Sequence, residues 1–319
     1  MGQENNNREI RKTTIGGQAL IEGLMMIGPD KKAMAVRNAK GEIELEFLAT
    51  GKVSKAETIP FIRGPVRVFK QLVLGTRALM RSAEIADPEE NSESDESDKG
   101  KKSSSERYSN FALYVSAVVS ILFSVVLFML LPGLIVDGIK ALFKIDLSSH
   151  LISLALTLFE GIIRVGIFIL YLWLVSKMDD IKRVWQYHGS EHKTIACYEA
   201  RMPLTVENIR EFSRFHPRCG TSFMFLIMIV SIIILAFVGW RSRWINLIVR
   251  LLLLPVIAGI TYEIIRLVGR YDNVLTRAIS KPGLAMQKLT TAEPDDSMIE
   301  VAIVAMEAVI PEQEGSDDW

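Results

Sequence analysis

Four long apolar runs separate the polar stretches of this chain. The runs cover residues 111–136, 151–175, 222–240 and 245–268. Each has roughly 19–25 residues, enough for a helix to cross a hydrocarbon layer about 30 Å thick. An amphipathic helix of a soluble protein needs only one apolar stripe, but these runs are apolar all round. The pattern predicts an α-helical multi-pass membrane protein with four transmembrane helices, forming a domain over residues 108–270.

The polar N-terminal stretch has a β pattern over residues 13–60. Residues 33–46 alternate apolar and polar about the segment 38–41, Asn-Ala-Lys-Gly, which is typical of a β-hairpin turn. We therefore expect a small β-rich cytoplasmic unit at the N-terminus, in front of the transmembrane domain.

Residues 61–85 combine basic residues at helical spacing with apolar ones, and this pattern predicts a basic amphipathic helix at the membrane interface. The alternative is a core helix of the β-rich unit. Residues 86–107 are acidic and Ser-rich and predict a disordered linker. Residues 271–310 predict C-terminal cytoplasmic helices, the last of which packs on the β-rich unit or on another chain.

The charge distribution predicts the orientation in the membrane. The loop 176–221 contains eight Lys and Arg residues, whereas only Lys140 and Lys144 lie between the first two runs. Because positively charged loops stay inside, we expect this loop and both termini to be cytoplasmic. The 37 basic and 37 acidic residues balance. This balance gives no reason to expect nucleic acid as a partner. The apolar runs predict the lipid bilayer as a partner, and a membrane or cytoplasmic protein is a further possible partner.

Ionisable residues interrupt two of the apolar runs. Glu160 and Arg164 are four residues apart in the second run, and Arg250 lies near the start of the fourth. Charges inside a membrane are costly and are usually paired or functional. Two interpretations stay open: a buried pair that fixes helix register, and a functional polar site.

Histidine and cysteine residues cluster in the long cytoplasmic loop. The chain has four His and two Cys, and five of these six lie between residues 188 and 219. Residues 188–192 read His-x-x-Glu-His, the order of the inverted zincin motif, in which the two His bind zinc and the Glu is a general base. A helix over 179–201 would place His188 and His192 on one face. Glu191 is then the candidate catalytic residue.

A third metal ligand is needed, and His216 or Cys219 could supply it, because the turn that holds them precedes the third run at the membrane face. Gly189 argues against the helix that this geometry requires. The two cysteines, Cys197 and Cys219, would lie in a reducing compartment, which favours metal binding or plain burial over a disulfide. Without a metal, the cluster would be a hydrogen-bonded brace of the loop.

Five longer motifs give the chain a family resemblance. They read GGQALIEGLMM, YHGSEHKTIACYE, HPRCGTSF, KPGLAMQKLTTAEPDD and EVAIVAMEAV. Together they resemble the YqhQ-like family of bacterial membrane proteins, which has no established function and is labelled a predicted metal-dependent enzyme family. The resemblance implies a multi-pass protein of the bacterial cytoplasmic membrane, and it supplies no reaction.

Two functions from different classes are consistent with these observations. The first is a zinc-dependent hydrolase at the cytoplasmic membrane face. The second is a non-catalytic scaffold or partner-binding protein whose His/Cys cluster is structural. A transporter is less favoured, because two of the four runs lack the polar residues that a pathway would need.

Overall fold

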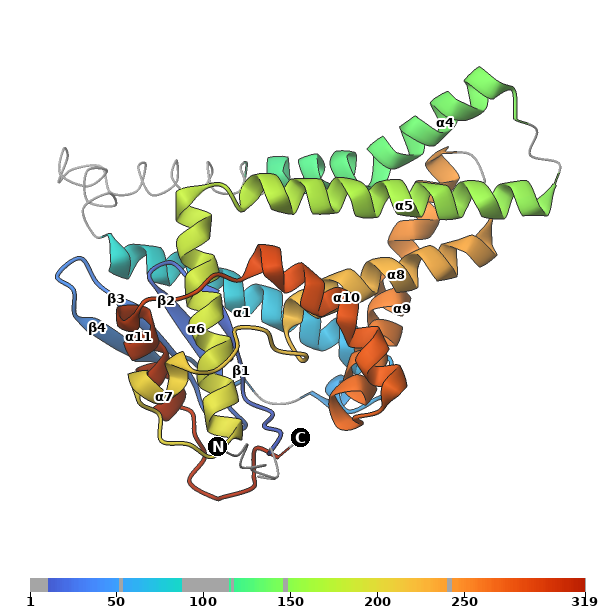
Figure 1. The fold of residues 1–319 in the computed structure, drawn as a ribbon. Coiled ribbons are helices and arrows are strands. Elements are labelled where there is room, and N and C mark those ends of the chain that lie inside the picture. Colours follow the sequence, from blue (N-terminus) through green and yellow to red (C-terminus); the bar gives the residue numbers. More distant parts are fainter. Residues whose placement is uncertain are drawn as a thin grey trace, which may run out of the picture.

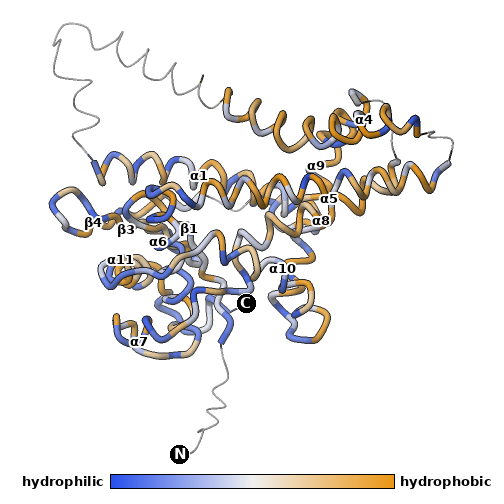
Figure 2. Tube along the Cα trace, turned by 45° about the horizontal axis from the view of Figure 1, so that its top comes forward, coloured by the Kyte–Doolittle hydropathy of each residue, from blue (hydrophilic) through white to orange (hydrophobic). Residues whose placement is uncertain are grey.

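Four long apolar helices and a smaller α/β unit make up the described part of the chain (Figure 1). A computed structural model describes residues 11–51, 54–87, 115, 118–145, 149–239 and 243–318. The predicted linker lies outside this description from residue 88 to residue 107. The four helices, Val118–Phe143, His150–Val175, Gly220–Val238 and Trp244–Arg270, are long and apolar enough to cross a membrane. Figure 2 shows hydrophobic residues concentrated along them.

The four helices follow the predicted runs closely. The first begins at Val118 and includes a π-helical turn, η2 (Val126–Leu130), followed by α4 (Leu131–Phe143). The others are α5 (His150–Val175), α8 (Gly220–Val238) and α9 (Arg243–Arg270). The first helix continues to Phe143, past the predicted end at residue 136. Asp137 and Lys140, one turn apart, form an ion pair of 3.2 Å there, so polar residues extend the helix beyond the apolar run.

The predicted β-rich unit is an antiparallel meander of four strands. The strands are β1 (Gly16–Leu20), β2 (Gly23–Ile27), β3 (Lys32–Arg37) and β4 (Ile43–Phe47), in this order across the sheet. The predicted hairpin turn joins β3 to β4. Gly41 there has φ of +84° and donates its N–H to the carbonyl of Asn38 at 2.9 Å.

Helices cover both faces of the sheet. On one face, Leu24, Met26, Ala33 and Ala35 pack against α6 (Asp179–Glu199) and α11 (Asp296–Glu307). On the other face, residues of β1, β2 and β3 pack against α1 (Arg63–Ala86). The unit thus has three layers, and the helix that carries the predicted metal motif lies directly on the sheet. Helix α11, the last of the predicted C-terminal helices, packs on the β-rich unit; the alternative was packing on another chain.

Helix α1 belongs to the core of this unit by one face only. Ala78 and Ile85 are buried against the sheet, whereas Phe69, Leu72 and Met80 are exposed. Its first turn contacts α9, where Arg63 donates from Nε to Glu263 Oε1 at 2.8 Å. The helix therefore joins the α/β unit to the fourth apolar helix.

Three charged residues meet between the apolar helices. Glu160 is 1% exposed, accepts from Arg164 at 2.8 Å and also pairs with Arg250. Arg164 Nε donates to the carbonyl of Phe128 in the π-helical turn at 3.0 Å. Both arginines thus compensate one buried carboxylate, and the π turn supplies an additional acceptor.

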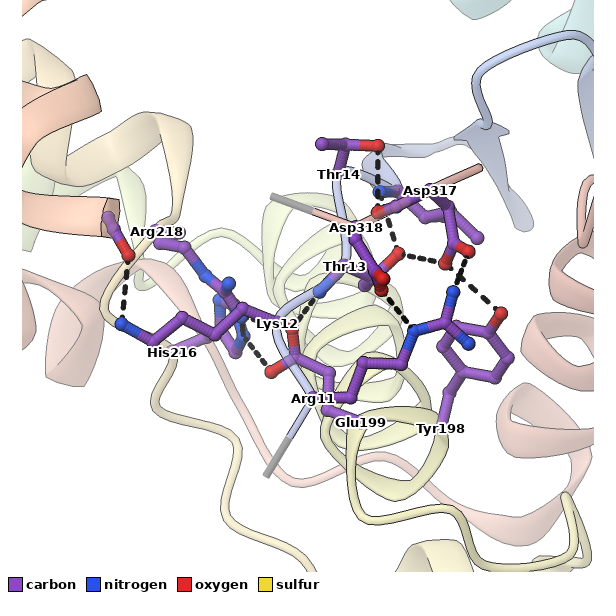
Figure 3. Close-up of polar contacts among 12 residues, drawn as sticks. Arg11, Lys12, Thr13, Thr14, Tyr198, Glu199, His216, Arg218, Asp317 and Asp318 are labelled. Carbon is purple, nitrogen blue, oxygen red and sulfur yellow. Dashed lines mark hydrogen bonds and ion pairs between the residues drawn. The ribbon is translucent and has the colours of Figure 1, made fainter. Parts of the chain in front are cut away.

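The two ends of the described chain meet at the C-terminal end of α6 (Figure 3). The Thr13 hydroxyl donates to Asp317 Oδ2 at 2.6 Å, and the Tyr198 hydroxyl donates to the same oxygen at 3.1 Å. Arg11 pairs with Asp317 and Asp318. This network fixes the segment before β1 and the last residues against the helix that carries the candidate site.

Candidate metal centre

Helix α6 carries the His-x-x-Glu-His motif without interruption. It runs from Asp179 to Glu199, which confirms the helix predicted over 179–201. Gly189 lies in the middle, where a Cβ would overlap the carbonyl oxygen of Ala292. The N–H of Ala292 donates to the carbonyl of Trp185 at 2.8 Å, so the segment after α10 (Val274–Thr290) runs against the helix. The glycine therefore permits a close approach of backbone and does not break the helix.

Cys219 approaches the motif from the start of α8. It is the N-cap of that helix, with an extended backbone, and its Sγ accepts from the Thr221 N–H at 3.4 Å. The positive end of a helix dipole favours an anionic sulfur at this position. The Pro and Gly residues of the sequence HPRCG allow the chain to turn there before the apolar helix begins.

The side chains of His188, His192 and Cys219 converge. Their candidate ligand atoms all lie within 4.8 Å of one another, and His188 Nε2 is 3.2 Å from Cys219 Sγ. The two imidazole ring centroids are 4.4 Å apart. Ligands of a tetrahedral zinc ion are about 3.3–3.8 Å apart at the usual bond lengths, so small side-chain rotations would bring the three atoms to that spacing.

Backbone carbonyls set the orientation of both imidazoles. His188 Nδ1 lies 2.7 Å from the carbonyl oxygen of Thr290, and His192 Nδ1 lies 2.6 Å from that of Arg214. A carbonyl only accepts, so each Nδ1 carries the hydrogen. Each Nε2 of a neutral ring then has a lone pair on the side of Cys219. His192 Nε2 is buried and has no hydrogen-bond partner among the described residues. Histidine ligands of metal ions are commonly oriented in this way.

The electrostatics of the cluster favour a thiolate. Burial raises the pKa of Cys219, but positive charge on His192 and His188 lowers it more, so the pKa is held well below its usual value. Burial lowers the pKa of His188, but the Cys219 thiolate and Glu191 raise it to about 9. Thiolate is the form of cysteine that binds metal ions. A bound ion would replace the extra proton of the imidazolium form, and the cluster would then supply one thiolate and two neutral imidazole donors.

Glu191 lies next to the cluster on the same helix. Burial raises the pKa of its carboxyl, and the neighbouring His188 and His192 lower it by less. A Cβ at Gly17 would come within 2.9 Å of the Glu191 Cδ, so the glycine of β1 makes room for this side chain. Within the part of the chain that the structure describes, Glu191 Oε2 is buried and has no hydrogen-bond partner. The carboxyl therefore packs against β1 and presents one oxygen that receives no hydrogen bond from the described residues.

His216 has other partners. Its Nε2 lies 3.5 Å from Glu199 Oε2, and Arg218 pairs with the same carboxylate, as Figure 3 shows. Its ring centroid is 5.7 Å from that of His192. Of the two residues predicted as the third ligand, Cys219 belongs to the group with His188 and His192. His216 lies next to His192 but pairs with Glu199 instead.

Two kinds of contact at this site were not predicted. The carbonyls of Thr290 and Arg214 are backbone groups that no side-chain pattern reveals. Glu199 and Arg218 could have been suspected from the sequence, because they lie inside the motifs YHGSEHKTIACYE and HPRCGTSF. The other cysteine, Cys197, is free and buried, and its pKa is raised to about 11 by burial.

The fold and the site together define a class of protein. It has four helices of membrane-spanning length and an α/β unit that holds a buried His/His/Cys cluster with an adjacent Glu. The sequence profile of the family described as "Protein of unknown function (DUF1385)" matches residues 59–312. The chain is 36% identical over 294 residues to "Uncharacterized protein YqhQ" of Bacillus subtilis (strain 168), covering 90% of this chain and 89% of that one.

The chain belongs to this family, which confirms the resemblance found in the sequence. No solved structure matches it.

Proposed function

We propose that the protein binds one zinc ion through His188, His192 and Cys219 and is a metal-dependent hydrolase at the cytoplasmic face of the bacterial cell membrane. The observation that carries the metal site is the orientation of the two imidazoles. Each Nδ1 faces a carbonyl, which leaves both Nε2 atoms for a shared ion beside Cys219 Sγ.

The number of ligands supports a catalytic rather than a structural ion. Structural zinc sites usually have four protein ligands, and catalytic sites have three. Among the described residues, the group contains three His, Cys, Asp or Glu side chains. Zinc would act as a Lewis acid that activates a water molecule. Glu191, with its raised pKa and one oxygen without a hydrogen bond, would accept the proton.

Burial of the cluster favours the second candidate, a structural site in a scaffold. The exposed fractions are 8% for His188, 2% for His192 and 8% for Cys219. In this case the ion would tie α6 to the start of α8, and the α/β unit would bind a partner protein. The bilayer is the proposed partner of the four apolar helices and of the exposed apolar face of α1.

Metal content tests the proposed ligands. Purified full-length protein should contain one zinc ion per chain by elemental analysis. His192→Ala should lose it, whereas His216→Asn, a matched change of a neighbouring buried imidazole, should keep it. A metal-free wild-type protein that also fails to bind added zinc would contradict the proposal.

Access of a small ligand separates the two candidates. In protein loaded with cobalt(II), an open coordination position should bind acetohydroxamate and change the visible spectrum. Glu191→Gln should keep both the metal and this response while losing hydrolysis. A spectrum that acetohydroxamate leaves unchanged would point to the structural site.

A further inference from the structure

A cavity of about 540 Å³ lies beside the loop that carries His216. Its walls come from the segment before β1, the C-terminal end of α6, residues 212–218, the end of α9, and α10. This volume is within the usual range for small-molecule sites, roughly 300–1,000 Å³. None of the three proposed metal ligands lines it, so the cavity is a separate site.

Cationic side chains outnumber carboxylates around the cavity. Four line it, Lys12, Arg218, Arg277 and Lys281, against the two carboxylates of Glu199 and Asp272.

Each carboxylate pairs with one of the two arginines, which leaves the two lysines as the excess positive charge. Glu199 pairs with Arg218 and accepts the Thr13 N–H at 2.8 Å, and Asp272 accepts from Arg277 Nε at 2.7 Å. Figure 3 shows Lys12 beside Glu199 and Arg218. The excess positive charge is thus available to an anion.

The two lysines are the groups best placed to bind it. Lys12 Nζ donates to the carbonyl of Gly269 at 3.0 Å, a bond that uses one of its three hydrogens. Lys281 is exposed on α10. Within the described part of the chain, neither lysine forms an ion pair. An ammonium group of this kind is a common phosphate ligand.

Part of the remaining lining is apolar and reaches the end of a membrane-length helix, beside the polar side chains of His216, Thr276 and Ser280. Phe212, Phe215 and Leu284 contribute carbon surface. Val268 and Gly269 also line the cavity and belong to the last residues of the helix Trp244–Arg270. A free phosphate ion gains nothing from contact with an apolar wall, whereas a phospholipid has an apolar part directly next to its phosphate.

We propose that this cavity binds the phosphate head group of a membrane lipid, with Lys12 and Lys281 on the phosphate and the aromatic wall against the first carbons of the lipid. Basic pockets at the ends of membrane helices recognise head groups by this combination of charge and position. The proposal does not depend on the metal site and holds whether or not an ion is bound there.

Binding of short-chain lipids to the full-length protein in a nonionic detergent tests the proposal. Dioctanoyl phosphatidic acid should bind saturably in microscale thermophoresis, and dioctanoylglycerol, which lacks the phosphate, should not. Lys12→Gln combined with Lys281→Gln should weaken binding by roughly 30-fold, the effect of two lysines near a membrane surface. The matched double variant Lys31→Gln with Lys288→Gln removes two exposed lysines outside the cavity and should stay within about twofold of wild type.

Three outcomes would overturn the proposal. The first is equal weakening by both double variants, because binding would then follow net charge alone. The second is equal binding of dioctanoylglycerol. The third is inorganic phosphate competing as strongly as the lipid, which would assign the cavity to free phosphate. Zinc content, measured on the same samples, should be unchanged in all variants and separates this test from the test of the metal site.

Discussion

His188 Nε2 and Cys219 Sγ lie 3.2 Å apart although 31 residues separate them in the chain. One belongs to a helix on the sheet and the other to the start of an apolar helix. The contact therefore joins the α/β unit to the membrane-length helices at the point where the chain passes from one to the other. An ion bound here would reinforce this junction, and its loss would loosen it.

Gly189 should be intolerant of a side chain. Gly189→Ala gains helix propensity worth about 1 kcal/mol, but its Cβ overlaps the Ala292 carbonyl, and overpacking against backbone costs about 1–3 kcal/mol or more. We expect a lower melting temperature in detergent. Gly166→Ala on α5, where a Cβ meets no atom of the described residues within 4 Å, is the control and should not destabilise. Equal behaviour of the two variants would refute the close approach.

Helix α6 follows from the sequence pattern, whereas the contacts around it depend on residues far away in the chain. Local sequence periodicity predicts the four apolar helices, the hairpin and α6, and all of these elements are present in the folded protein. By helix propensity alone, Gly189 predicts a weaker helix. The Ala292 carbonyl, which requires a glycine at this position, lies about one hundred residues further along the chain. The choice between His216 and Cys219 also stayed open, since spacing alone does not tell which side chain of a turn faces the helix. Only tertiary packing decides both.

The ion pair of Glu57 and Lys70 should make stability depend on acid pH. The Lys70 ammonium and the Ser54 N–H lower the pKa of Glu57 from 4.5 to about 2. A carboxyl whose pKa is lowered by folding stabilises the protein above its unfolded pKa. This contribution is therefore present above about pH 4.5 and is lost as the pH falls towards 2.

Melting temperatures of wild type and Glu57→Gln, measured from pH 6 to pH 3, test this dependence. The difference between the two should be largest at pH 6 and should shrink below pH 4.5. A difference that does not change with pH would show that the carboxylate charge contributes nothing.

Glu160 should be needed to compensate the two arginines between the apolar helices. Glu160→Gln leaves Arg164 and Arg250 without their shared carboxylate. Breaking a buried ion pair in this way costs about 3–5 kcal/mol. Glu160→Gln combined with Arg250→Gln removes one cation as well, and Arg164 keeps the Phe128 carbonyl, so the double variant should unfold at higher denaturant than the single one. The reverse order would contradict the role of charge.

Reporter fusions test the proposed orientation of the four helices. Alkaline phosphatase folds only outside the cytoplasm, so it should be active when fused after Lys144 and inactive when fused after Trp319. A fluorescent protein that folds only inside should give the opposite pattern. Phosphatase activity after Trp319 would place the His/Cys cluster on the outer side and overturn the orientation.

X-ray absorption at the zinc edge tests the central claim most directly, because it reports the atoms bound to the ion in the intact protein. For the wild type we expect one sulfur at about 2.3 Å and three nitrogen or oxygen atoms at about 2.0–2.1 Å, two of them with the scattering pattern of imidazole. Cys219→Ser should remove the sulfur, and His216→Asn should leave the spectrum unchanged. A wild-type spectrum without sulfur, or one that changes in His216→Asn, would contradict the site built from His188, His192 and Cys219.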